Sequence, residues 1–194
     1  ARAAQTLNEW LGSGVLAQDG QPAFYVYEQT FDIASGGASR SQVVTRRGVF
    51  GAIKLEPFGS GCVYPHEETF GGPKADRLNL MRACSACVSP VFGLVPDTER
   101  AFAGLLERAA GGRKPDCEFA DENRIVNRVW VVTDQAWCAA LSKRLAPASV
   151  YIADGHHRYE TFCNYRNERR AADKDPDGKL DRDYNHGLIV LVPM

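Results

Sequence analysis

The clearest pattern of apolar and polar positions lies at residues 150–166. The run Val150–Ile152 consists of β-forming residues, and the next positions, Asp154 and Gly155, are typical of a turn or a helix cap. From Tyr159 onward the apolar positions fall three and four residues apart, which is the spacing of a helix face. The pattern therefore predicts a strand, a tight turn and a helix in direct succession.

The rest of the chain shows the same two kinds of periodicity. We expect helices at residues 1–11, from Pro73 to about Cys87, after a cap at Asp97 or Thr98, and from Thr133 to Pro147. We expect strands at 22–33, 42–55, 91–95, 116–121, 125–132 and 186–193. Segments 22–33 and 42–55 flank a Gly/Ser turn at 35–39 and read as an antiparallel hairpin, with Gly48 and Gly51 marking a bulge or bend.

This succession predicts an α+β fold (mixed α/β) in which helices pack on an antiparallel or mixed sheet. We expect residues 1–194 to form a single domain or a fragment of a longer protein, because the sequence opens inside a helical pattern and closes on a buried-strand pattern. The loop at 57–61 is the best subdivision point, and it would separate residues 1–56 from residues 62–194.

Composition limits the classes of function. The chain has 194 residues, of which 44% are hydrophobic and 24% charged, as in ordinary globular proteins. A net charge of −1 gives no broad basic footprint, so a nucleic-acid partner is not expected. No apolar run spans a membrane, and six irregularly spaced cysteines do not make a disulfide scaffold. We therefore expect a cytoplasmic protein without a membrane partner.

A first candidate site is the predicted helix start after Asp154. Gly155 is followed by His156, His157 and Arg158, where backbone N–H groups lack helical partners and the dipole is positive. Such a start favours an anion, most often a phosphate. In the alternative interpretation, Asp154 is only a helix cap and the basic first turn is only solvated.

A second group of polar residues lies upstream. His66 and Glu67 fall in a predicted loop, where burial of the backbone does not explain them. Lys74, Asp76 and Arg77 fall at a predicted helix start, and cations there oppose the helix dipole. These residues are candidates for binding a phosphate or an acidic substrate. The alternative is a solvated helix start.

Metal binding has a weaker basis in the sequence. The pair Cys84 and Cys87 has CxxC spacing without a second pair, so we interpret both as core residues and expect no structural zinc. A two-histidine, one-carboxylate set of His66, His156 and Asp154 is a further alternative. The sequence contains no Walker loop, dinucleotide fingerprint or nucleophile elbow, and we expect neither haem nor flavin.

Two motifs taken together carry a family resemblance. The run Tyr151–Thr161, with His66-Glu67-x-Thr69 and Pro73-Lys74-x-Asp76-Arg77 upstream, resembles a bacterial and archaeal family catalogued as domain of unknown function 1015. The resemblance also covers Pro22–Tyr27 and Ser89–Phe92, and it implies a protein longer at both ends. It implies no settled activity.

A shorter likeness concerns Gly155–Arg158 alone. It is similar to the Gly-x-x-Arg box of the ParB/sulfiredoxin superfamily, with which ParB partition proteins hold nucleotide phosphates. The form beginning Asp-Gly-His is closest to the free serine kinases of that fold. His156 stands where sulfiredoxins have cysteine, which speaks against sulfinic acid repair.

These observations lead to one functional expectation with two alternatives. We expect kinase-like phosphoryl transfer from a nucleotide to a small hydroxyl metabolite, with Mg²⁺ and a nucleotide as cofactors. The candidate catalytic residues are Glu67 as general base, His156 and His157 as donors, and Asp154 as the Mg²⁺ ligand. Gly155, Arg158, His66, Lys74, Asp76 and Arg77 are the candidate binding residues. The alternatives are a non-catalytic nucleotide sensor, with a homodimer left open, and a metal-dependent hydrolase.

Overall fold

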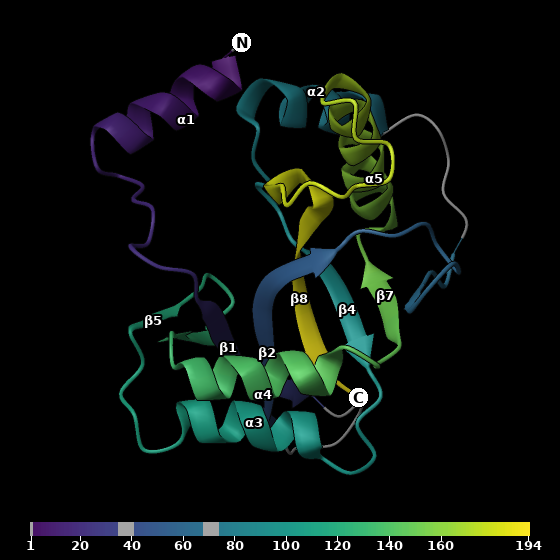
Figure 1. Ribbon diagram of the computed structural model, residues 1–194. Helices are drawn as coiled ribbons and strands as arrows, with labels where there is room; N and C mark the ends of the chain where they lie inside the picture. The colour runs from purple at the N-terminus through teal and green to yellow at the C-terminus, as the bar shows by residue number, and fades with distance from the viewer. Residues whose placement is uncertain (1, 35–40, 68–73) are drawn as a thin grey trace. The chain divides into compact units, whose positions relative to one another are not determined.

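The computed structural model describes residues 2–34, 41–67 and 74–194 (Figure 1). The helices are α1 Arg2–Gly12, α2 Lys74–Cys84, α3 Ala101–Ala110, α4 Gln135–Leu145, α5 His156–Ala172 and a short 3-10 turn at Asp183–Asn185. The strands are β1 Phe24–Ala34, β2 Ser41–Lys54, β3 Val63–Tyr64, β4 Val91–Val95, β5 Cys117–Ala120, β6 Val126–Val132, β7 Val150–Asp154 and β8 His186–Pro193. The predicted α+β class is confirmed.

The strands form a mixed eight-stranded sheet in the order β3-β7-β4-β8-β2-β1-β6-β5. The chain forms two compact units that interleave along the sequence. The first unit contains residues 1–20, 52–93 and 149–189, and the second contains residues 21–51, 94–148 and 190–194. The loop at 57–61 lies inside the first unit.

In the second unit β1 is flanked by β2 and β6, and both neighbours run antiparallel to it. The register with β2 continues from Tyr25↔Phe50 to Ala34↔Ser41 without interruption, so the predicted hairpin is confirmed and there is no bulge at Gly48. Gly51 lies beyond the paired residues, and the bend predicted there stays a prediction. Gly48 serves a different purpose. A Cβ on it would stand 2.7 Å from the Leu191 carbonyl oxygen, so the glycine allows a close approach of two backbones.

The Asp97 side chain binds the first turn of α3, as the sequence predicted, although the N-cap position itself is Arg100. Its buried carboxylate accepts the N–H groups of Phe102 at 3.0 Å and Ala103 at 2.8 Å. Arg144 of α4 adds an ion pair at 2.9 Å. The apolar positions of α3 are buried as the helical spacing predicted: Phe102, Leu105, Leu106 and Ala109.

In the first unit β3 runs parallel to β7, and α5 follows β7 directly. Helix α2 packs beside α5 (Figure 1), and Arg82 pairs with Glu168 across the two helices. Tyr159 and Phe162 are buried on the inner face of α5, as their spacing predicted. Both motifs of the sequence therefore lie in this unit.

Two predicted helix boundaries are wrong. Helix α2 ends at Cys84 and not at Cys87, because Ser85 has a left-handed backbone with φ 51°. Helix α4 begins after Asp134, whose side chain accepts the Trp137 N–H at 2.7 Å, so the cap is Asp134 and not Thr133. All six cysteines lie in the described part of the chain and are free thiols.

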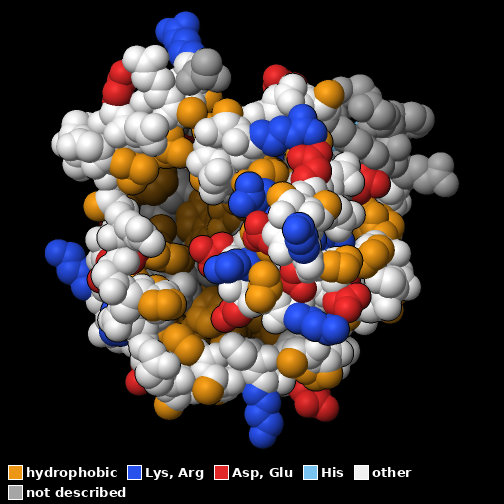
Figure 2. Space-filling view, turned by 45° about the horizontal axis from the view of Figure 1, so that its top comes forward, with side chains coloured by type: hydrophobic (Ala, Val, Ile, Leu, Met, Phe, Trp, Pro, Cys, Tyr) orange, Lys and Arg blue, Asp and Glu red, His pale blue; other side chains and the backbone are white. Residues whose placement is uncertain are grey.

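Three predicted features lie outside the described residues: the Gly/Ser turn at 35–39, the motif position Thr69 and the helix-start proline Pro73. In the described part of the chain, none of the helices combines the length and the apolar character that crossing a membrane requires. On the face that Figure 2 shows, basic and acidic side chains are interspersed, and no broad basic field forms there.

Candidate active site at the carboxyl ends of β3 and β7

The parallel pairing of β3 and β7 brings the two sequence motifs to one place. Val63 is opposite Val150, and Tyr64 is opposite Tyr151, so both strands end at the same edge. The segment after β3 carries His66 and Glu67, and the segment after β7 leads into α5. Ligands of α/β sheets bind outside such carboxyl ends.

His66 is fixed by a backbone carbonyl. Its Nδ1 lies 2.5 Å from the carbonyl oxygen of Ile152 in β7. A carbonyl only accepts hydrogen bonds, so Nδ1 carries a proton and, in the neutral ring, Nε2 carries the lone pair. The ring itself is exposed. His66 therefore offers an acceptor at Nε2 to a ligand in the site.

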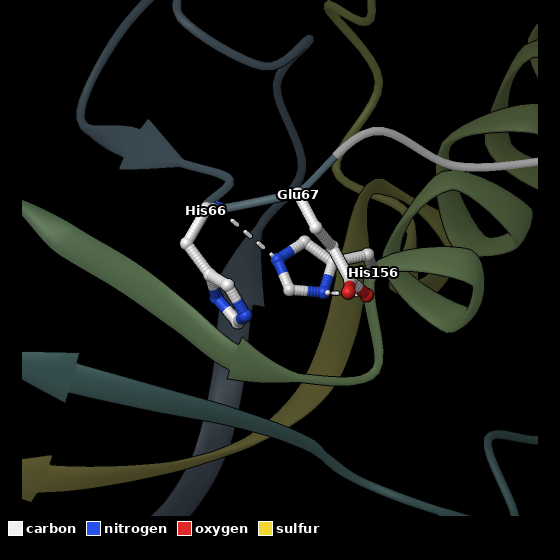
Figure 3. A group of neighbouring side chains, drawn as sticks. All are labelled: His66, Glu67 and His156. Atoms are coloured by element: carbon white, nitrogen blue, oxygen red, sulfur yellow. Dashed lines mark hydrogen bonds and ion pairs between the residues drawn. The ribbon is translucent and has the colours of Figure 1, made fainter.

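His156, the first residue of α5, is 1% exposed and contacts both His66 and Glu67, which follow β3. The backbone N–H of His66 donates to its Nε2 at 3.3 Å, so a neutral His156 carries its proton on Nδ1. That Nδ1 lies 3.0 Å from Oε1 of Glu67 (Figure 3). The contact is not aligned as a hydrogen bond, and the buried Nδ1 has no aligned partner in the described residues.

Glu67 is free to complete that hydrogen bond. Its side chain is 54% exposed, so a small rotation aligns the carboxylate at little cost. Catalytic hydrogen bonds are often poorly aligned before a ligand binds. The site thus contains a buried histidine whose N–H faces an exposed carboxylate.

Burial lowers the pKa of His156, and the nearby charge of His66 lowers it further. The carboxylates of Glu67 and Asp154 oppose the shift but do not reverse it. The charged ring is disfavoured because a buried cation loses its hydration. His156 is therefore a neutral Nδ1–H donor at neutral pH.

This lowered pKa predicts an acid-sensitive fold. Below the unfolded-state histidine pKa of about 6.5, His156 is protonated in the unfolded chain but stays neutral in the native protein. The free energy of unfolding therefore falls as the pH falls. We expect His156→Gln, which keeps a side-chain donor and acceptor, to lose less stability than wild type between about pH 7.5 and 5.5. Urea unfolding at both pH values measures this difference. Equal losses in the two proteins would contradict the assignment.

The start of α5 has no side-chain cap. Gly155 occupies the N-cap position with φ 91°, a conformation that favours glycine. Asp154 does not cap the helix, which contradicts the alternative interpretation of this residue; its Oδ2 accepts from Arg158 at 2.7 Å instead. No acidic residue lies in the first turn. The positive end of the 17-residue helix thus meets the site without an internal anion.

Arg158 lies across Gly155. A Cβ on Gly155 would stand 3.2 Å from the guanidinium carbon, so a larger residue there would push the arginine side chain aside. The guanidinium donates to Asp154 and to the Pro90 carbonyl oxygen. These two contacts orient the side chain and use part of its five donors. Its predicted role as a phosphate clamp stays a prediction.

Arg77 and Arg158 line the same cavity of about 210 Å³ between α2 and α5, although they are far apart in the sequence. Leu80, Val88 and Phe162 supply apolar lining, and Ser89 and Thr161 add hydroxyl groups. Asp76 is exposed in the first turn of α2. Lys74 begins that helix, and its side chain lies outside the described residues.

A family model described as "Protein of unknown function (DUF1015)" matches residues 1–194. The chain belongs to this family. Neither the curated proteins nor the solved structures contain a match to it. The chemistry of this DUF1015 chain therefore has to be argued from its own side chains.

The structure changes the metal set that the sequence indicated. One ligand atom each from His66, Glu67 and His156 lie within 4.8 Å of one another, whereas the sequence indicated Asp154 as the carboxylate. The protonation of His156 counts against a metal there. Its Nε2 accepts a backbone N–H, so binding a metal at Nδ1 would strip the ring of its last proton.

Sequence reasoning missed the backbone partners of the DUF1015 site. The carbonyls of Ile152 and Pro90 orient His66 and Arg158, and no residue type announces such a role. Phe58 was also missed, although its ring lies 6.4 Å from that of His156. The turn containing Phe58 was visible in the sequence, but its place beside α5 was not.

His157, the other predicted histidine, lies in the first turn of α5 and is half-buried.

Proposed function

We propose that this DUF1015 chain transfers a phosphoryl group from a nucleotide to the hydroxyl of a small metabolite. The observation that supports the proposal best is the contact of Glu67 with the Nδ1–H of buried His156 at the uncapped start of α5. It puts a candidate base next to a candidate phosphate site. Phosphoryl transfer needs little beyond positioning and charge neutralisation.

Glu67 is the proposed general base. Once the Glu67 side chain has rotated into alignment, His156 holds one carboxylate oxygen through its Nδ1–H, and the other oxygen accepts the proton of the attacking hydroxyl. Because the pKa of His156 is lowered by burial, the ring stays neutral and acts as a fixed hydrogen-bond donor. His156 is thus a positioning residue, whereas the sequence alone gave it the same role as His157.

The phosphates are proposed to bind at the start of α5. There the helix dipole and the first-turn N–H groups attract an anion, and Arg158 adds the guanidinium donors that Asp154 and Pro90 do not use. Asp154 is 69% exposed, and only its Oδ2 takes part in the ion pair with Arg158. Its other oxygen is the proposed ligand of Mg²⁺, which prefers carboxylate and phosphate oxygens.

The acceptor is proposed to bind in the cavity lined by Arg77 and Arg158. About 210 Å³ suits a small metabolite, and two guanidinium groups suit an acceptor that carries an anionic group. The apolar lining from Leu80 and Val88 accommodates a short carbon chain. His66 offers Nε2 as a further acceptor near Glu67.

Metal-dependent hydrolysis is the second candidate, and the approach of His66, Glu67 and His156 to within 4.8 Å favours it. Two histidines and a carboxylate are a common set for zinc or iron. The hydrogen bond from the His66 backbone to His156 Nε2 weighs against it, because that bond already uses the one lone pair with which the neutral ring could bind a metal. We rank it below phosphoryl transfer for this reason.

A thermal-shift screen tests the proposal. The chain is titrated with ATP, ADP, GTP, CTP and inorganic tripolyphosphate, with and without Mg²⁺, and its transition-metal content is measured in parallel. A ligand at 100 times its dissociation constant stabilises the fold by about 2.7 kcal/mol, which raises the melting temperature of a chain of this size by about 5 to 11 °C. We expect a nucleotide-dependent shift that Mg²⁺ enlarges. No shift, together with one equivalent of zinc or iron, would overturn the proposal in favour of the hydrolase.

A further inference from the structure

A second cavity opens on another side of α5, still within the first unit. Its volume is about 390 Å³, and its lining includes Phe58, Tyr159, Cys163, Asn164, Arg166 and Asn167. The combination of two aromatic rings, two amides and a guanidinium differs from the lining of the cavity that contains Arg77 and Arg158. None of the functions assigned above uses it.

Phe58 connects this cavity to the catalytic residues. Its ring stacks on Tyr159, with centroids 4.9 Å apart and an interplanar angle of 19°. The same ring lies 6.4 Å from that of His156. Phe58 therefore lines the cavity and also packs near the first residue of α5.

The cavity is held rigidly by the chain itself. The Tyr159 hydroxyl donates to the Glu56 carbonyl oxygen at 3.0 Å and accepts the Glu56 N–H at 3.2 Å. The guanidinium of Arg166 donates to the Leu55 carbonyl oxygen at 2.6 Å. These bonds fasten the segment that carries Phe58 to α5, so the ring is in position before a ligand arrives.

The amides are oriented for recognition. Arg166 is 5% exposed and donates through Nε and Nη2 to Oδ1 of Asn167, at 3.1 and 3.0 Å. The oxygen of Asn167 is thereby turned toward the arginine, and its amide nitrogen presents two donors on the other side. Asn164 is exposed, one helical turn nearer the catalytic residues, and lines the same cavity.

The spacing along α5 suits a nucleotide. From His157 to Asn164 the helix rises by about 10 Å, a distance that the phosphates and ribose of a nucleotide can span. Phosphates at the start of the helix would therefore put a nucleobase beside the two asparagines. Aromatic faces and amide groups are the usual partners of a base.

We propose that the base of the donor nucleotide binds in this cavity, in contact with the ring of Phe58 and with the amides of Asn164 and Asn167. This inference rests on the proposed phosphoryl transfer, since it takes the phosphates to lie at the start of α5. Contacts to the base would make the protein bind a nucleotide more tightly than a polyphosphate that lacks a base. The nucleotide lies along α5, with its base away from Glu67.

The test compares a nucleotide with its baseless counterpart. Dissociation constants are measured by calorimetry, with Mg²⁺, for tripolyphosphate and for whichever of ATP, GTP and CTP binds most tightly. The proteins are the wild-type chain, Phe58→Leu, Asn164→Ala, and Asn8→Ala as a matched exposed helical asparagine in α1. Asn164 is exposed, so its variant folds even where Phe58→Leu does not.

We expect the wild-type chain and Asn8→Ala to bind the nucleotide at least about tenfold more tightly than tripolyphosphate. Phe58→Leu and Asn164→Ala should lose most of that preference while their tripolyphosphate affinity stays within about twofold. Equal binding of both ligands by wild type, or a preference retained in both variants, would overturn this inference and leave the phosphate site standing. Failure to bind either ligand would overturn the proposed function as well.

Discussion

Glu67→Gln is expected to lower the turnover of phosphoryl transfer by at least about 100-fold, because glutamine cannot accept the proton of the attacking hydroxyl. The nucleotide dissociation constant should stay within about twofold of wild type, since Glu67 does not contact the phosphates in the proposed arrangement. The substitution is nearly isosteric, and Glu67 is half exposed, so the fold should be unaffected. Steady-state rates and calorimetry on the same samples measure both effects.

Glu122→Gln is the matched control for this change. Glu122 is exposed in the turn between β5 and β6, and its replacement removes the same charge without touching the site. We expect that variant to keep wild-type turnover. If Glu67→Gln retained more than about a tenth of the wild-type rate, Glu67 would be excluded as the general base.

Arg158→Ala is expected to weaken nucleotide binding by at least about tenfold, which corresponds to the loss of one charge-assisted contact to phosphate. The variant also releases Asp154 from its ion pair, which frees both carboxylate oxygens for Mg²⁺, so Mg²⁺ should aid the remaining binding at least as much as in wild type. Stability should change little, because the partner carboxylate is exposed and remains hydrated. Calorimetric titration with and without Mg²⁺ separates the two effects on binding.

Two further variants sharpen this prediction. Arg158→Lys keeps the charge but loses the planar fork, so its affinity should fall between those of wild type and Arg158→Ala. Arg108→Ala removes an exposed arginine from the last turn of α3 and should bind nucleotide as wild type does. Unchanged affinity in Arg158→Ala would remove the phosphate site from the start of α5.

Local elements of this fold could be predicted because neighbouring residues determine them. The change from β-forming residues to helical spacing after Asp154 predicted β7 and α5, and the apolar spacing of α3 predicted its buried face. Capping was harder to predict, because a cap residue can be engaged by another side chain. Asp154 has a high propensity to cap a helix, but Arg158 engages its carboxylate one turn later.

Long-range pairing was beyond the sequence. Nothing in the two residues of β3 shows that they run parallel to β7, yet that pairing joins His66 and Glu67 to His156. Gly48 looked like a bulge because its role, to admit the Leu191 carbonyl, depends on a strand far along the chain.

The candidate site was predictable as a set of residues but not as a set of roles. His66, Glu67 and His156 stood out because their side chains were unexpected in a loop and a first turn. Which ring nitrogen carries a proton depends on backbone groups that the sequence does not reveal. The second cavity on α5 escaped notice because Arg166 and Asn167 look like an ordinary polar helix face.

The most direct measurement is nucleotide-dependent phosphorylation of small hydroxyl compounds, followed by nucleoside diphosphate release across a library of acceptors. Wild type and Glu67→Gln are assayed side by side with Mg²⁺. The account predicts that one class of anionic, hydroxyl-bearing acceptor stimulates release in wild type, and that Glu67→Gln loses this stimulation by at least about 100-fold. Release that no acceptor stimulates, or stimulation that survives in Glu67→Gln, would contradict phosphoryl transfer by this site.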